Sequence, residues 1–87
     1  MNFKEIIKKA KKNARVRNYY YINEDCSNLT KSFIHIITVE YGIRHWSDLF
    51  EAIKEYTGFT IDPKKSELKN LDYFLFKYNH NNILNNE

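Results

Sequence analysis

The chain contains few of the residues that small folds use for covalent bridges and tight turns. Its 87 residues include one cysteine, one proline and two glycines. A single cysteine excludes an intramolecular disulfide framework and predicts a reducing, cytoplasmic compartment. Because β-sandwiches and barrels need many tight turns, the scarcity of glycine and proline disfavours both architectures.

Long apolar runs are also missing. No stretch approaches the roughly 18 apolar residues that a membrane-spanning helix needs, so we expect no membrane partner. The beginning of the chain is basic, but no apolar run with a small-residue cleavage site follows it, so we expect no secretory signal. The length predicts one globular domain, which we place at residues 1–79, followed by a frayed tail at residues 80–87.

Patterns typical of catalysis or metal binding are weak. One cysteine and three scattered histidines lack the spacing of zinc ligands, and neither glycine lies in a phosphate-binding loop. We therefore predict no metal and no cofactor. A Cys26 nucleophile with a histidine base is the alternative, but the neighbouring Asp25 would raise the pKa of the thiol. The sequence predicts a protein that is not an enzyme.

Two segments show the apolar spacing of amphipathic helices most clearly. Apolar residues recur every three or four positions from Phe3 to Ala14, and Asn2 is a suitable N-cap for this helix. The same spacing predicts a helix from Trp46 to Tyr56, which Gly58 would end.

A further helix is expected near the end of the chain. Asp62 is a suitable N-cap, and Pro63 suits the first helical position. We expect the first and third helices to bury their apolar faces against this last one. Its predicted core face consists of Leu68, Leu71, Leu75 and Tyr78.

The segment from Leu29 to Tyr41 is ambiguous because it is rich in β-branched residues. The pair Gly42–Ile43 is typical of the residues that follow a helix, and this favours a helical interpretation. We therefore predict a mainly α fold, a compact bundle of about four short helices. The alternative is an α+β fold in which residues 16–22 and 33–41 form a hairpin.

Charge is unevenly distributed along the chain. Residues 1–17 contain seven Lys or Arg and one Glu, a local balance of +6, whereas the whole chain carries +3. Clustered cations neutralise phosphates, and tyrosine rings stack on unpaired bases. We therefore predict a nucleic-acid or partner-binding surface on the first helix. Its residues are Lys4, Lys8, Lys11, Lys12, Arg15, Arg17 and Tyr19.

The helices on either side of Gly42 have the short connection of a helix-turn-helix. Its second helix would have to present Asp48, Glu51 and Glu55 to DNA, which is electrostatically unfavourable. This reading is therefore disfavoured.

Aromatic residues suggest a second surface. Tyr73, Phe76 and Tyr78 lie on the last helix and form a possible protein interface, which could also mediate a homodimer. Burial of these rings in the domain's own core is the alternative.

The composition gives a general resemblance without any motif. Asn, Lys, Ile, Phe and Tyr dominate, and the small size together with this AT-rich codon usage resembles small phage or mobile-element proteins that bind a host factor. We expect a non-catalytic protein that binds nucleic acid, or a nucleic-acid-handling host protein, through its basic helix. The alternative is an inhibitor or immunity-type module that binds one protein partner through its aromatic C-terminal helix.

Overall fold

The computed structural model describes residues 1–22 and 24–81, with side chains described as far as Asn79. It contains helices α1 (Phe3–Val16), α2 (Asn28–Val39), α3 (Trp46–Thr57) and α4 (Glu67–Asn81), and no strand among these residues. The predicted mainly α bundle is confirmed. The hairpin alternative is not formed, because α2 occupies most of residues 33–41. Residues 80 and 81 continue α4, and the rest of the predicted tail lies outside the described residues.

The start of α1 agrees with the prediction. The side chain of Asn2 accepts a hydrogen bond from the backbone N–H of Glu5 at 3.2 Å, which satisfies one of the free donors of the first turn. The helix extends two residues beyond the predicted end, to Val16. Arg17 then adopts an extended conformation, and Tyr20 and Tyr21 form a turn instead of a strand.

The ambiguous segment is helical, as predicted. Ser27 caps α2, because its side chain accepts a hydrogen bond from the backbone N–H of Thr30 at 3.2 Å. At the other end Gly42 has φ +68°, a left-handed conformation that favours glycine. The N–H of Ile43 donates to the carbonyl of Ile37 at 3.1 Å. Burial of Phe33 and its neighbours outweighs the strand preference of the β-branched residues.

The predicted start of the last helix was wrong. The side chain of Asp62 accepts from the backbone N–H of Lys64 at 2.9 Å, so this carboxylate stabilises a turn rather than a helix. Instead, α4 begins at Glu67, and the Ser66 hydroxyl accepts from the backbone N–H of Lys69 at 3.2 Å. The buried side chain of Asn70 bonds to the backbone of Asp62 in both directions, accepting at 2.7 Å and donating at 3.1 Å. These bonds hold the connecting loop against α4 and keep it out of the helix.

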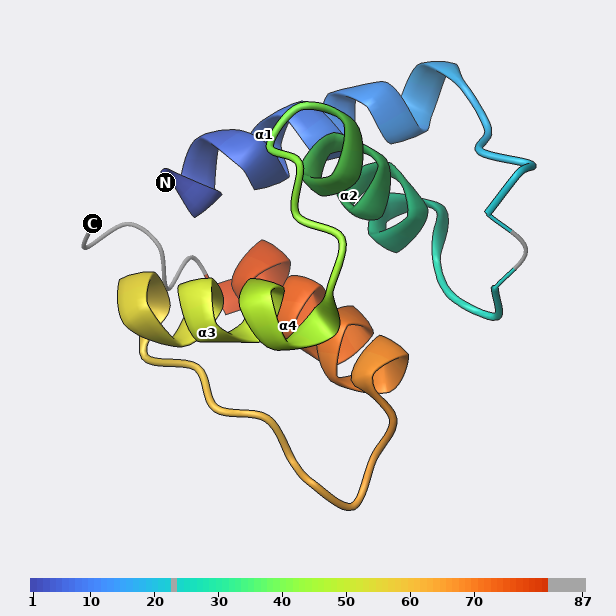
Figure 1. The fold of residues 1–87 in the computed structure, drawn as a ribbon. Helices are drawn as coiled ribbons and strands as arrows, with labels where there is room; N and C mark the ends of the chain where they lie inside the picture. The colour runs from blue at the N-terminus through green and yellow to red at the C-terminus, as the bar shows by residue number, and fades with distance from the viewer. Residues whose placement is uncertain (23, 82–87) are drawn as a thin grey trace.

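The helices lie in two layers (Figure 1). In that view α1 and α2 lie above α3 and α4. The side chain of Ser32 on α2 donates to the carbonyl of Ala10 on α1 at 2.9 Å, and Asn28 donates to the carbonyls of Ala14 and Arg17 at 2.8 and 3.1 Å. The main partner of α1 is therefore α2 and not the last helix, which corrects the expected packing. Two small residues, Ala10 and Ser32, face each other at this contact.

Phe3 connects all four helices. It is completely buried, and its ring stacks on Phe33 of α2 with the centroids 6.3 Å apart. The same ring makes edge contacts with Tyr56 of α3 at 6.2 Å and with Phe74 of α4 at 6.3 Å. Buried aromatic residues provide much of the core of a small domain. Phe3 therefore attaches the inner side of α1 to the other three helices. The outer side of α1 is left facing solvent.

Candidate functional site

Five basic side chains lie together on the outer side of α1 and are called the basic face below. Their spacing of one, three or four residues places them on neighbouring parts of the helix surface. Four of them are exposed and Lys11 is half-buried. With a rise of about 1.5 Å per residue, Lys4 and Arg15 are roughly 16 Å apart along the helix axis. The members are Lys4, Lys8, Lys11, Lys12 and Arg15.

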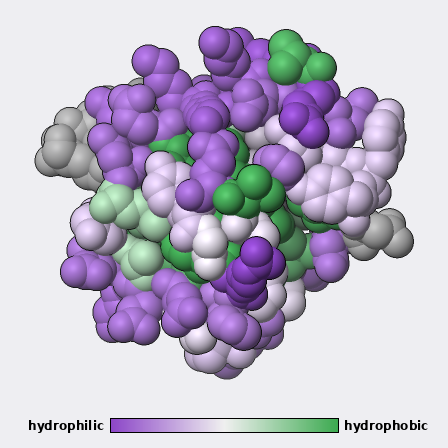
Figure 2. All heavy atoms as spheres, turned by 45° about the horizontal axis from the view of Figure 1, so that its top comes forward, coloured by the Kyte–Doolittle hydropathy of each residue, from purple (hydrophilic) through white to green (hydrophobic). Residues whose placement is uncertain are grey.

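Among the described residues, no carboxylate forms an ion pair with the basic face. Within residues 1–22 and 24–81, the one ion pair joins Lys9 Nζ to Glu40 Oε1 at 2.7 Å. Lys9 lies outside the basic face. Figure 2 turns the side of α1 and α2 toward the viewer and shows hydrophilic residues over most of the upper part of the molecule. The structure therefore leaves the five charges available to an external anion.

Tyr19 does not belong to this exposed surface, which corrects its place among the predicted contacts. Its side chain is only 2% exposed, and its hydroxyl lies 3.4 Å from the Ser32 hydroxyl. The ring also packs against His35 with the centroids 5.1 Å apart. Arg17 is exposed, and its guanidinium lies 4.8 Å from the centre of the Tyr19 ring. Tyr19 thus positions Arg17 beside the end of the basic face.

The two following tyrosines are exposed, although the predicted binding surface did not include them. Tyr20 is 85% exposed and Tyr21 is 66% exposed. The hydroxyl of Tyr21 is hydrogen-bonded to Nδ1 of His35, and the two rings meet edge to face. The run of three tyrosines predicts aromatic contacts. Because the three residues are identical, the sequence does not predict which of the three rings is buried.

The aromatic residues of α4 divide in the same way. Tyr73 and Phe76 are 52% and 60% exposed. Tyr78 is buried, and its hydroxyl donates to the carbonyl of Thr57 at 3.1 Å, so its ring belongs to the core and not to an interface. Tyr73 lies beside Phe59, with the ring centroids 6.3 Å apart. The exposed aromatic surface is therefore smaller than the sequence suggested.

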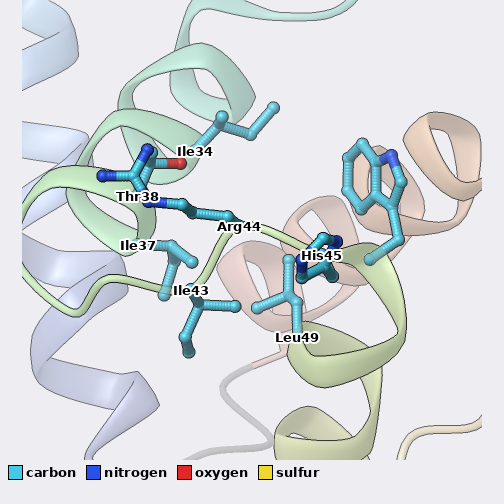
Figure 3. A pocket seen from close by; sticks show the side chains of 8 residues that line it. Ile34, Ile37, Thr38, Ile43, Arg44, His45 and Leu49 are labelled. Carbon is cyan, nitrogen blue, oxygen red and sulfur yellow. The ribbon is translucent and has the colours of Figure 1, made fainter.

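A cavity of about 190 Å³ lies between α2, α3 and the loop that joins them. Figure 3 shows Arg44 extending past the apolar side chains of Ile34, Ile37 and Ile43 toward Thr38. Such a cavity offers hydrophobic contacts and one guanidinium. A second cavity, of about 220 Å³, is lined by residues of α2 and α4 that include Phe76.

The environment of Cys26 is unfavourable for a nucleophile. Burial raises the pKa of its thiol, the carboxylate of Asp72 raises it further, and Lys31 acts in the opposite direction. The thiolate fraction at neutral pH is thus lower than that of an ordinary cysteine. Among the described residues, no three His, Cys, Asp or Glu side chains come together as metal ligands.

Within the part of the chain that the structure describes, no helix has both the length and the apolarity to cross a membrane. Comparison with models of protein families, with curated proteins and with solved structures finds no match to this chain.

Proposed function

We propose that this protein binds nucleic acid without catalysis, through the basic face of α1. The observation that carries the proposal is the clustering of five cations on one helix, four of them exposed, with no carboxylate of the described residues paired to them. Lysine and arginine in this arrangement neutralise successive phosphates and release their counterions. The single cysteine supports a cytoplasmic location, and the composition supports a phage or mobile-element origin.

Folding stability does not explain the arrangement of these charges. Lys4 lies in the first turn of α1, where the helix dipole favours negative charge. Lys8 has like charges three or four residues away in both directions along the helix, at Lys4, Lys11 and Lys12. Such pairs repel each other. Glu5 in the first turn and Arg15 in the last turn complement the dipole, but Glu5 is the single acidic residue of the helix. The repulsion among the lysines supports a role in binding an external anion.

A salt series tests the proposal. Fluorescence anisotropy would measure the affinity for labelled 20-nucleotide DNA and RNA at several salt concentrations, and we expect affinity to fall steeply as salt rises. The double variant Lys8→Glu/Lys11→Glu should weaken binding by about tenfold to a hundredfold at low salt and reduce the salt slope by about 2.

The matched control moves the same charge change to other helices. Lys54 on α3 and Lys69 on α4 are exposed, so Lys54→Glu/Lys69→Glu alters the net charge equally but leaves the basic face intact. We expect this control to bind within about threefold of the unchanged protein, since long-range charge effects are screened by salt. No detectable affinity for any nucleic acid at low salt, or equal losses in both variants, would contradict the proposal.

A protein partner is the second candidate, because Tyr73 and Phe76 expose more than half of their surface on α4. Aromatic side chains of this kind are typical hot spots of protein interfaces. An inhibitor or immunity-type module would lose its partner on Tyr73→Ala/Phe76→Ala while keeping its helical content. A pull-down with and without nuclease separates the two candidates, and analytical ultracentrifugation detects a homodimer formed by this surface. A nucleic-acid-handling host protein retained by the basic face after nuclease treatment would replace nucleic acid as the direct target.

A further inference from the structure

The most exposed aromatic residue lies just beyond the basic face. Tyr20 is 85% exposed, a larger fraction than any other exposed large hydrophobic side chain of the described residues. It follows Arg15 by five residues, which span at most about 18 Å even when fully extended. The phosphate-binding helix therefore leads directly into an exposed aromatic ring.

Tyr20 is held outward by contacts on both sides of it. Tyr19 is anchored in the core, and its carbonyl accepts from the N–H of Ile22 at 3.0 Å, which closes a turn around Tyr20 and Tyr21. Tyr21 is fixed by the hydrogen bond to His35. The side chain of Asn18 donates to the Tyr20 hydroxyl at 3.1 Å. The ring is thus presented at the tip of an anchored turn, so little conformational entropy is lost when it makes a contact.

We infer that the surface recognises single-stranded nucleic acid, with the basic face along the phosphates and Tyr20 stacked on an unpaired base. This inference depends on the proposed function and adds the class of ligand to it. An aromatic ring beside a row of cations is the combination by which proteins bind single strands without reading sequence.

Duplex DNA fits this surface less well. The bases of a duplex are stacked on each other, so the face of an aromatic side chain has no base to cover unless the duplex opens. In addition, the helix that a helix-turn-helix would insert into the major groove, α3, exposes Asp48, Glu51 and Glu55, which repel phosphates. Tyr20 gains a partner only where bases are unpaired.

The test compares single-stranded and duplex probes of equal length. Anisotropy would be measured on a 20-nucleotide thymidine strand, a 20-nucleotide uridine strand and a 20-base-pair duplex, which separates DNA from RNA and paired from unpaired bases. We expect both single strands to bind more tightly than the duplex. Tyr20→Ala should weaken single-strand binding by about 5- to 100-fold, the range for one stacked base, and change duplex binding less than about twofold.

Two further variants make the result interpretable. Tyr20→Phe keeps the ring and should retain single-strand affinity within about threefold, which separates stacking from hydrogen bonding by the hydroxyl. Lys8→Glu/Lys11→Glu should lower the affinity for all three probes. Since Tyr20 is exposed, circular dichroism should show unchanged helical content in its variants.

The possible failures are distinct. Equal effects of Tyr20→Ala on single strands and duplex, or tighter binding of the duplex, would overturn this inference while the lysine variants still supported the proposed function. Loss of binding in Tyr20→Phe would show that the hydroxyl and not the ring makes the contact, and would also overturn it. No effect of the lysine variants on any probe would remove both proposals.

Discussion

Helices α1 and α3 are similar in length and in the apolar side that each turns toward the core, yet their outer sides carry opposite charge. α1 buries Phe3, Ile6, Ile7 and Ala10, and α3 buries Leu49, Phe50 and Ile53. The outer side of α1 carries the basic face, whereas that of α3 carries three acidic residues and one lysine. The inner sides serve the same purpose, and only the outer sides differ.

The difference separates the residues that determine the fold from those available for function. An acidic residue at the start of α3, Asp48, complements the helix dipole, so its position also favours folding. Lys4 at the start of α1 opposes the dipole. Like charges four residues apart occur on both helices, as Glu51 and Glu55 on α3 and as Lys4 and Lys8 on α1. The two helices therefore differ in the sign of their outer charge and in the charge that begins each helix. Only the positive outer side of α1 attracts an anionic partner such as nucleic acid.

The largest expected effect tests the inner side of α1. Phe3→Ala removes a completely buried ring that touches the other three helices, so the free energy of unfolding should fall by about 3–5 kcal/mol. Lys8→Ala on the outer side of the same helix should change it by less than about 0.5 kcal/mol. Urea unfolding followed by circular dichroism measures both. A cost of 1 kcal/mol or less for Phe3→Ala would show that this ring does not hold the two layers together.

The second prediction moves the positive charge from one helix to the other. Each Lys→Glu or Glu→Lys change alters the charge by two units, so combining Lys8→Glu/Lys11→Glu with Glu51→Lys/Glu55→Lys restores the formal net charge of +3. We expect nucleic-acid affinity to stay about tenfold to a hundredfold below that of the unchanged protein, because position and not net charge decides binding.

The relevant readout is again anisotropy at low salt, with circular dichroism as the folding control. Full recovery of affinity in this four-residue variant would mean that α1 and α3 are equivalent as binding surfaces. In that case the contrast between the two helices would have no functional meaning.

The smallest effect concerns the lysine of α1 that has a partner in the fold. Lys9 and Glu40 keep 52% and 40% of their side chains exposed, so solvent screens their attraction. Lys9→Ala should therefore lower the free energy of unfolding by no more than about 1 kcal/mol. Its effect on nucleic-acid affinity should be smaller than that of Lys8→Ala. If Lys9→Ala lowered the affinity more than Lys8→Ala, Lys9 would belong to the binding surface.

The sequence alone predicted the four helices, α2 as the favoured one of two interpretations, and several of their ends. Asn2, Gly42 and Gly58 act through neighbours a few residues away, so their meaning can be interpreted locally, and all three limit helices as predicted. The concentration of charge on α1 is equally local, because helical spacing alone places those side chains together. What these residues bind stays a proposal.

Only the tertiary structure decided which of several similar residues turn inward. Tyr19 is buried and Tyr20 is exposed because Ser32 and His35 of α2 contact the Tyr19 side chain and leave the Tyr20 ring in solvent. Likewise, Asn70 draws Asp62 into a loop and so moves the start of α4. These outcomes depend on groups 8 to 16 residues away in the chain, and local spacing contains no information about contacts between segments that meet only when the helices pack.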